Sequence, residues 1–409
     1  MFELVNGRLG LPTVRVAETD GIYLHSLYDP VTEAHRLVDT WDVPHDTHRL
    51  TIVGLGLGYH VAECLRRFPN VEEVQVIECS DELVALAKSC FPETLADTRV
   101  RIVTPVECSE VGRLVSAEDI QSVFFHPPSL TILAHEPTRV VLAEILMLQA
   151  STRVLLPRLQ SNWSHHKRLV SRSTALTGEQ GGHRGRAGVL VSAGPSLDGA
   201  RSSLASYQQS GAVLVVVSAA LKRVLGWGIV PDYAVHTDSS DKACAHIEGL
   251  TQFSRVPQLL ALPTVHPSFV DYYPGPVRWA LQQGLDDVNE FATLHHYDTF
   301  PTGGSVATLG LSLLHYFGCD PIVFIGQDLA YVQGQAYASG IHREISPGSR
   351  SELCVPSVYG GLTETTLSWN SFRHWIEHFI LTHPDRLYIN RSYGAKIAGT
   401  RSEPSGEFT

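Results

Sequence analysis

Short, nearly continuous runs of aliphatic and β-branched residues alternate with segments of helical periodicity along most of this chain. From Leu50 an apolar run enters a glycine turn, a helical segment follows to about Phe68, and a second apolar run ends at Glu78. The alternation resumes after Val189 with the runs V-L-V-S, A-V-L-V-V-V-S, D-Y-A-V-H-T-D, Q-L-L-A-L-P and P-I-V-F-I-G. Such runs, separated by helices, are typical of parallel strands buried on both faces. The pattern predicts an α/β protein with two Rossmann-like parallel-sheet domains.

Changes in this pattern indicate where the domains begin and end. We expect a β-rich N-terminal cap over 1–50, a Rossmann-like domain over 51–165, a linker over 166–188, a catalytic domain over 189–400 and a tail over 401–409. A length of 409 residues exceeds one ordinary core, which agrees with this division. A polar, basic and glycine-rich stretch lies between Trp163 and Gly188, and its second half is the best linker candidate. This stretch is either a solvated face or a cationic lip for an anionic substrate.

Composition narrows the class of protein. The net charge of −11 disfavours a nucleic-acid binder, because phosphate contacts need a basic face. The seven cysteines form no C-x-x-C pair, and the N-terminus lacks the layout of a signal peptide. No apolar stretch reaches membrane-spanning length without a charge. We therefore expect a cytoplasmic protein with free thiols, no membrane span and no nucleic-acid partner.

Two glycine-centred turns carry the strongest chemical signal. The first is V-L-V-S-A-G-P-S-L-D, which includes Ser192, Gly194, Pro195 and Ser196. The second is P-T-G-G-S-V-A at 301–307. Glycine lets the backbone approach a ligand, and a following helix offers amide groups to a phosphate. Two such turns at one sheet edge predict a nucleotide site.

A third glycine turn, G-L-G-L-G at 54–58, lies in the first Rossmann-like segment. Glu78 follows it at the spacing of a dinucleotide or S-adenosylmethionine site. The segment that would bind a target amine in an amino-methyltransferase reads H-P-P-S from His126 and lacks a carboxylate or amide. We favour a structural role for this domain over an active methyltransferase.

The order of these motifs resembles that of the Maf (motility accessory factor) flagellin glycosyltransferases, over about residues 50 to 400. Their catalytic domain is similar to the 6-hydroxymethylpterin diphosphokinases of archaea. S-A-G-P-S-L also resembles the G-P-S-L turn that cradles the cytidine monophosphate (CMP) of an activated sialic acid in bacterial sialyltransferases. The resemblance implies a sialyltransferase-type nucleotide-sugar fold for the second domain. The segment Y-I-N-R-S-Y-G-A-K-I-A-G-T at 388–400 resembles the family's C-terminal motif.

The resemblance implies which residues bind the donor. They are Ser192, Gly194, Pro195, Ser196, Thr302, Gly303, Gly304, Ser305, Gln327 and Asp328. Asp238 ends the strand after a G-I-V-P-D turn, where it would contact sugar hydroxyls or orient a base, although it could instead cap a helix.

The general base is the least constrained assignment. Family members often carry a histidine where this chain has Tyr337, and His342 is the nearest histidine. We take His342 as the candidate catalytic base and Asp238 as the next.

The expected function is transfer of a nonulosonic acid, of pseudaminic or legionaminic type, from a CMP-activated donor to Ser or Thr hydroxyls of flagellin. Sialyltransferases of this kind need no metal, so no metal or other cofactor is expected. One alternative is a pterin diphosphokinase that uses ATP and Mg²⁺ held by Asp238 and Asp328. Another is a non-catalytic flagellin-binding accessory protein.

Overall fold

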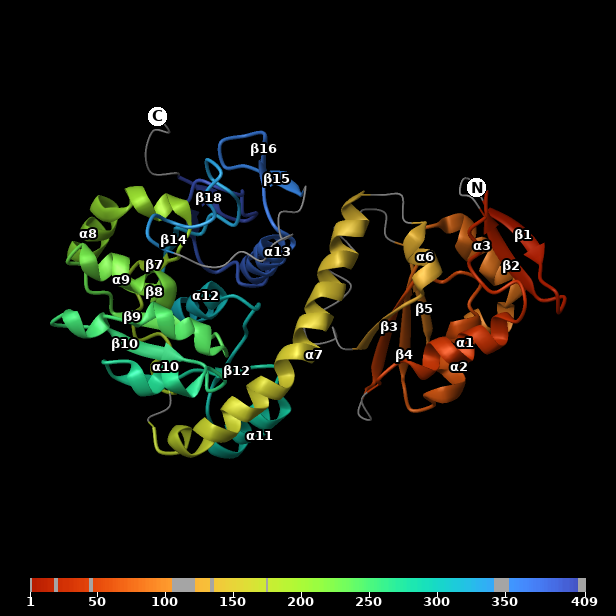
Figure 1. Cartoon of the computed structure of the whole chain (residues 1–409), viewed down its shortest axis with the longest axis horizontal. Coiled ribbons are helices and arrows are strands. Elements are labelled where there is room, and N and C mark those ends of the chain that lie inside the picture. Colours follow the sequence, from red (N-terminus) through yellow and green to blue (C-terminus); the bar gives the residue numbers. More distant parts are fainter. Residues whose placement is uncertain are drawn as a thin grey trace. The chain divides into compact units, whose positions relative to one another are not determined.

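The computed structural model describes residues 2–17, 21–43, 47–104, 122–132, 136–173, 176–341 and 353–403. The chain divides into two compact units, 1–151 and 152–409 (Figure 1). Helix α7 (Glu136–Val170) begins in the first unit and ends in the second. Within the described residues, no helix is long and apolar enough to span a membrane.

A parallel four-stranded sheet forms the centre of the first unit. Its order is β5-β4-β3-β6, and each neighbouring pair is parallel. The strands are β3 (Arg49–Val53), β4 (Glu73–Ile77), β5 (Val100–Val103) and β6 (Val123–Phe125). The last four residues of β3 and of β4 are buried, as expected for strands covered on both faces.

Helices and a hairpin complete the first unit. The helices are α1 (Pro30–Asp39), α2 (Tyr59–Arg67), α3 (Asp81–Cys90), α4 (Pro92–Leu95) and α6 (Pro127–Thr131). The antiparallel hairpin consists of β1 (Phe2–Asn6) and β2 (Pro12–Val16). The expected cap over 1–50 therefore contains helix α1 as well as strands. Asp29 begins this helix, because its Oδ1 accepts the amides of Val31 and Thr32.

The second unit is built on an eight-stranded sheet in which every pair is parallel. Its order is β11-β10-β9-β8-β7-β14-β17-β18. The strands are β7 (Gly188–Val191), β8 (Val213–Val217), β9 (Tyr233–His236), β10 (Gln258–Ala261), β11 (Val277–Trp279), β14 (Ile322–Ile325), β17 (Tyr388–Asn390) and β18 (Arg401–Ser402). Together with the first sheet, this confirms the predicted α/β class with two parallel-sheet domains.

Helices cover this larger sheet. They are α8 (Arg201–Gln209), α9 (Ser218–Gly226), α10 (Pro267–Tyr272), α11 (Asp286–His295), α12 (Val306–Tyr316) and α13 (Leu367–Thr382). The short 3₁₀ helices are η2 (Pro195–Gly199), η3 (Asp241–His246) and η4 (Leu250–Gln252). There are also two small two-stranded sheets in the described part of this unit. One pairs β12 (Leu281–Gln282) with β13 (Thr299–Phe300), and the other pairs β15 (Cys354–Pro356) with β16 (Leu362–Glu364). Gly310 brings α12 onto the sheet, since a Cβ there would lie 2.5 Å from the Leu190 side chain.

The segment expected as a linker is folded where the structure describes it. Helix α7 continues to Val170, and further on the amides of Gly181 and His183 donate to the carbonyls of Tyr316 and Phe317 at the end of α12. Because α12 leads into β14, these contacts lie at the amino edge of the sheet. The glycine-rich part of the stretch therefore lies at the amino edge, whereas its first residues, on α7, lie near the carboxyl end of β10, where His166 Nδ1 is 2.9 Å from the Pro263 carbonyl oxygen.

Candidate functional site

Strand β7 is the point at which the connections of the large sheet change direction. Strands β8 to β11 follow it on one side, and β14, β17 and β18 lie on the other. Open parallel sheets bind ligands beyond the carboxyl ends of their strands at such a point. Ser192 to Ser196 follow β7, and Gly326 to Asp328 follow β14. The segments 192–196 and 326–328 therefore meet at the switch point of the sheet.

The side chain of Asp328 joins the loops at this edge. Its Oδ2 accepts the amide and the hydroxyl of Ser196, both at 2.9 Å. Its Oδ1 accepts the amide of Tyr393 at 2.8 Å and that of Gly394 at 3.2 Å. One carboxylate thus joins its own loop to two other segments that are distant in sequence.

Close backbone packing explains the glycines around Asp328. A Cβ on Gly194 would lie 2.3 Å from Asp328 Oδ2 and 2.6 Å from the Gly326 carbonyl oxygen. A Cβ on Gly394 would lie 2.3 Å from the Asp328 carbonyl oxygen. Gly194 was predicted to let a ligand approach the backbone, but close packing of the chain's own loops already requires a glycine there.

A second contact ties the same loops together. The Ser192 hydroxyl donates to Gln327 Oε1 at 2.5 Å, and the Gln327 amide donates to Ser392 Oγ at 2.9 Å. All three residues are buried. The C-terminal motif at 388–400 therefore contributes to the site through its backbone and Ser392.

The electrostatics of Asp328 follow from its burial. The side chain is 2% exposed, and desolvation raises the pKa of its carboxyl. The amides of Ser196, Tyr393 and Gly394 and the Ser196 hydroxyl oppose that rise by stabilising the carboxylate. Since its oxygens are engaged inside the protein, Asp328 acts here as a positioning residue.

The amides of the first glycine turn are also engaged internally. The Gly194 amide donates to the Gly326 carbonyl at 2.8 Å, and the Leu197 amide donates to the Gly194 carbonyl at 3.0 Å. The turn opens η2 in place of the expected α-helix, and α8 follows. These amides would have to give up their present hydrogen bonds to backbone carbonyls before they could bind a phosphate.

The second glycine turn, 302–305, begins helix α12 at the same edge of the sheet. Its start lies there because α12 leads to β14, which begins at the opposite edge. The Gly303 amide donates to Thr308 Oγ1 at 2.9 Å, and a Cβ on Gly303 would lie 2.3 Å from the Trp375 ring. Ser305 makes no side-chain cap, and its Oγ is buried with no partner among the described residues. The helix N-terminus and this hydroxyl are the features of the turn that suit an anion.

Asp238 lies two residues beyond β9 and is half-buried. Its Oδ1 accepts the Ser240 amide at 2.9 Å, which stabilises a turn and is not the helix cap of the alternative interpretation, because Ser240 and not Asp238 is the N-cap of η3. The loop is also held from α7, because Asn162 Nδ2 donates to the Ser239 carbonyl at 3.1 Å and the Thr264 carbonyl at 2.9 Å. Sequence reasoning missed Asn162, and an isolated asparagine in a polar helix offers no signal.

His236, at the end of β9, is a second residue that the sequence did not indicate. It is completely buried, its ring stacks on Phe269 with centroids 3.5 Å apart, and its Nδ1 lies 2.9 Å from Ser218 Oγ. Burial lowers the pKa of His236 to about 3, although nearby Asp238 acts in the opposite direction. The imidazole is therefore neutral at physiological pH.

His342, the candidate base, lies outside the described residues. The segment before it contacts the first glycine turn: the Ala338 amide donates to the Ala193 carbonyl at 2.9 Å. Ser339 donates its amide and hydroxyl to Asp198, which also pairs with Arg223. The chain thus approaches the switch point just before His342.

The glycine turn of the first unit is filled by protein atoms. Glu78 Oε2 accepts the Leu55 amide at 2.9 Å, and Glu78 is 4% exposed. A Cβ on Gly54 would lie 2.4 Å from the Ser129 Cβ, and one on Gly56 would lie 2.5 Å from His25 Nε2. The acid and glycines that a cofactor would use are engaged in internal contacts, which favours a structural role over methyltransferase activity.

Comparison with known proteins agrees with the predicted family resemblance. Residues 162–334 match the model of the 6-hydroxymethylpterin diphosphokinase MptE-like family. The structure resembles that of a MAf glycosyltransferase from Magnetospirillum magneticum AMB-1 with a TM-score of 0.53 and 15% sequence identity, covering 99% of this chain and 70% of that one. No curated protein matches the sequence. The expected resemblance is confirmed in both the domain type and the fold.

Proposed function

We propose that this chain, which carries an MptE-like domain and has the fold of a Maf glycosyltransferase, is itself a glycosyltransferase. The observation that carries the proposal is the convergence of the 192–196, 302–305 and 326–328 segments at the carboxyl edge of one parallel sheet. Such an edge suits a phosphate-bearing donor. The donor proposed is a CMP-activated nonulosonic acid, and the acceptors are Ser or Thr hydroxyls of flagellin.

The chemistry places specific demands on this edge. As the bond between the sugar and the phosphate oxygen breaks, CMP leaves with the bonding electrons and the sugar becomes oxocarbenium-like. The acceptor oxygen then bonds to the same carbon and releases its proton to a base. Thr302, Ser305 and the first-turn amides of α12 would stabilise the departing phosphate. His342 is the proposed base, with Asp238 as the alternative.

Calorimetric titration of the full chain with CMP tests the donor assignment. We expect Ser305→Ala to weaken CMP binding about tenfold, because a hydrogen bond to a charged phosphate is lost. Ser206→Ala, at an exposed site on α8, is the matched control and should bind as wild type. Absence of CMP binding to the folded wild-type chain would contradict the donor assignment. Transfer to flagellin from a CMP-nonulosonic acid then tests the full reaction.

The family description favours a second candidate, a pterin diphosphokinase that transfers diphosphate from ATP. That activity would need Mg²⁺ ligands at this edge, and Asp238 and Asp328 are the proposed ones. The four hydrogen bonds accepted by Asp328 count against it as a ligand. Magnesium-dependent ATP binding in preference to CMP would reverse the order of the two candidates.

A third candidate, a non-catalytic flagellin-binding protein, makes a different prediction. It requires that the chain bind flagellin and bind neither CMP nor ATP. A flagellin pull-down alongside the nucleotide titrations separates it from both enzymes.

A further inference from the structure

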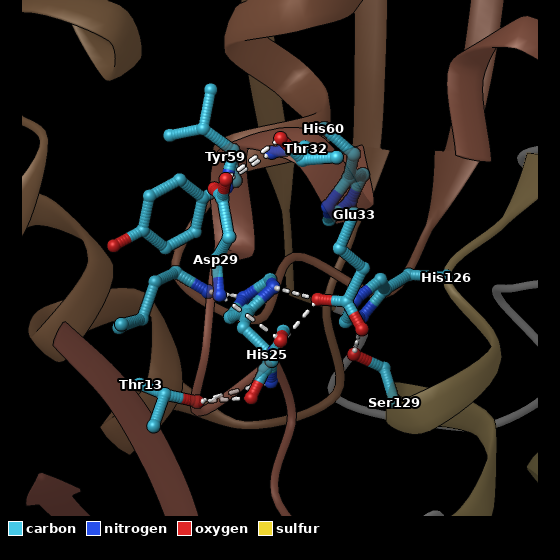
Figure 2. Close-up of polar contacts among 12 residues, drawn as sticks. Thr13, His25, Asp29, Thr32, Glu33, Tyr59, His60, His126 and Ser129 are labelled. Atoms are coloured by element: carbon cyan, nitrogen blue, oxygen red, sulfur yellow. Dashed lines mark hydrogen bonds and ion pairs between the residues drawn. The ribbon is translucent and has the colours of Figure 1, made fainter. Parts of the chain in front are cut away.

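Three histidines gather at the carboxyl edge of the sheet in the first unit (Figure 2). His25 precedes α1, His60 lies in the first turn of α2, and His126 follows β6. Their exposed fractions are 3%, 1% and 2%, and one potential ligand atom from each lies within 4.8 Å of the others. We propose that His25, His60 and His126 bind one divalent transition-metal cation, of which Zn²⁺ is the best match.

The hydrogen bonding of His60 leaves one ring nitrogen unprotonated and without a partner among the described residues. Its Nε2 lies 2.9 Å from the Gly54 carbonyl oxygen, and a carbonyl can only accept, so Nε2 carries the proton. Nδ1 therefore carries the lone pair, and it is buried with no hydrogen-bond partner among the described residues. Metal-binding histidines commonly donate their other ring N–H to a backbone carbonyl in this way.

The other two rings share this arrangement. His25 Nε2 accepts the Leu57 amide at 2.8 Å, so its proton is on Nδ1, which lies 3.9 Å from the Glu33 carboxylate. His126 Nδ1 lies 2.7 Å from Ser129 Oγ, and the ring also bonds to the Leu24 carbonyl. Each imidazole thus has an N–H toward a carbonyl or carboxylate. The basic nitrogens of His25 and His126 each face a neutral donor that a cation can displace, and that of His60 has no partner among the described residues.

The protonation state of the three rings suits a ligand. Burial lowers the pKa of His25 to about 3 and that of His60 to about 4, and burial together with the neighbouring histidines lowers the pKa of His126 well below its ordinary value. Neutral imidazole is the form that ligates zinc. The nearby carboxylate of Glu33 would partly balance the charge of the cation.

Binding requires a small local adjustment. Tetrahedral zinc with Zn–N bonds of about 2.0 Å needs its ligand nitrogens about 3.3 Å apart. In this structure the potential ligand atoms of the three histidines lie up to 4.8 Å from one another. The His60 and His126 rings are stacked at 4.3 Å with 6° between their planes, so one of them must turn. Rotation about χ2 of histidine is soft. Ser129 Oγ or a water would supply the fourth ligand.

The cation would have a structural role in the first unit. The His25 and His126 side chains lie beside Gly54 and Gly56, where a Rossmann domain places its cofactor. A bound ion would join the segment before α1 to α2 and α6. Because it would bind the folded state, it would raise the thermal midpoint Tm.

The test uses the full chain, stripped with a chelator and titrated with Co²⁺ as a spectroscopic probe and with Zn²⁺ as the competitor. We expect one equivalent of Co²⁺ with tetrahedral absorption bands, displaced by Zn²⁺, and a rise of Tm with Zn²⁺. His60→Gln keeps a donor for the Gly54 carbonyl and should abolish the bands. His48→Gln is the control, because the His48 side chain is 75% exposed and is not a member of the cluster.

The outcomes are distinguishable from those of the proposed function, because the readouts use no nucleotide or acceptor. Lack of tight Co²⁺ or Zn²⁺ binding by folded wild type would overturn the metal site, as would His60→Gln and His126→Asn variants that bind like wild type. If a variant fails to fold without metal, metal content and the Zn²⁺ effect on Tm of the wild type decide the question.

Discussion

The Asp328 carboxylate accepts both the amide and the hydroxyl of Ser196 at 2.9 Å, across 132 residues of chain. This pair connects the loop after β7 to the loop after β14, at the point where the sheet changes direction. The geometry of the candidate site therefore depends on a buried charge and not on a flexible surface contact.

Replacing Asp328 with Asn tests that dependence. An amide can accept on one side only, so at least one pair of donors would face an N–H₂ group. We expect the free energy of unfolding to fall by about 2–4 kcal/mol and CMP binding to weaken. Urea denaturation followed by circular dichroism measures the first effect. Asp287→Asn, at an exposed position on α11, should change stability far less.

Gly194→Ala probes the close packing of the same loops. Its Cβ would lie 2.3 Å from Asp328 Oδ2 and 2.6 Å from the Gly326 carbonyl oxygen, so a loop must shift. We expect a loss of about 2–3 kcal/mol in unfolding free energy. Gly226→Ala is the matched control, because a Cβ at this helical site meets nothing within 4 Å. Equal stability of the two variants would contradict the packing argument.

Asn162→Ala removes the side chain through which α7 holds the loops after β9 and β10. Two buried carbonyls, of Ser239 and Thr264, would lose a donor. We expect destabilisation by about 1–3 kcal/mol, read from the thermal midpoint. Gln160→Ala, an exposed site on the same helix, should leave the midpoint nearly unchanged.

His236 predicts a dependence of stability on pH. Burial lowers its pKa to about 3 in the folded chain, whereas the unfolded chain titrates near 6.5. The unfolded state therefore takes up a proton first as pH falls. The stability that His236 contributes is complete above pH 6.5 and is lost progressively from there toward pH 3.

The loss at pH 5 is about 2 kcal/mol for this one group. His236→Gln keeps polar atoms near Ser218 without the titration. Urea denaturation at pH 7 and pH 5 should show that the stability difference between wild type and variant shifts by that amount in favour of the variant. An unchanged difference would mean that His236 is not the group responsible.

The sequence alone determined the α/β class and the segments that form the candidate site. Strands such as V-L-V-S after Val189 were recognisable because burial on both faces leaves an apolar run. Ser192 and Ser196 were also recognisable in a glycine turn that follows such a run, and the family resemblance indicated Gln327 and Asp328. Patterns of this kind can be read from the sequence because they involve residues that are close together along the chain.

Only the tertiary structure decided how those residues are used. Asp328 accepts hydrogen bonds from Ser196, and close packing against Asp328 and Trp375 requires glycine at 194 and 303. The histidine cluster is likewise invisible in sequence, since its members lie in three separate segments and only the sheet edge brings them together. Hydrogen bonding and close packing depend on which distant segments become neighbours, and the chain topology, not local periodicity, sets that.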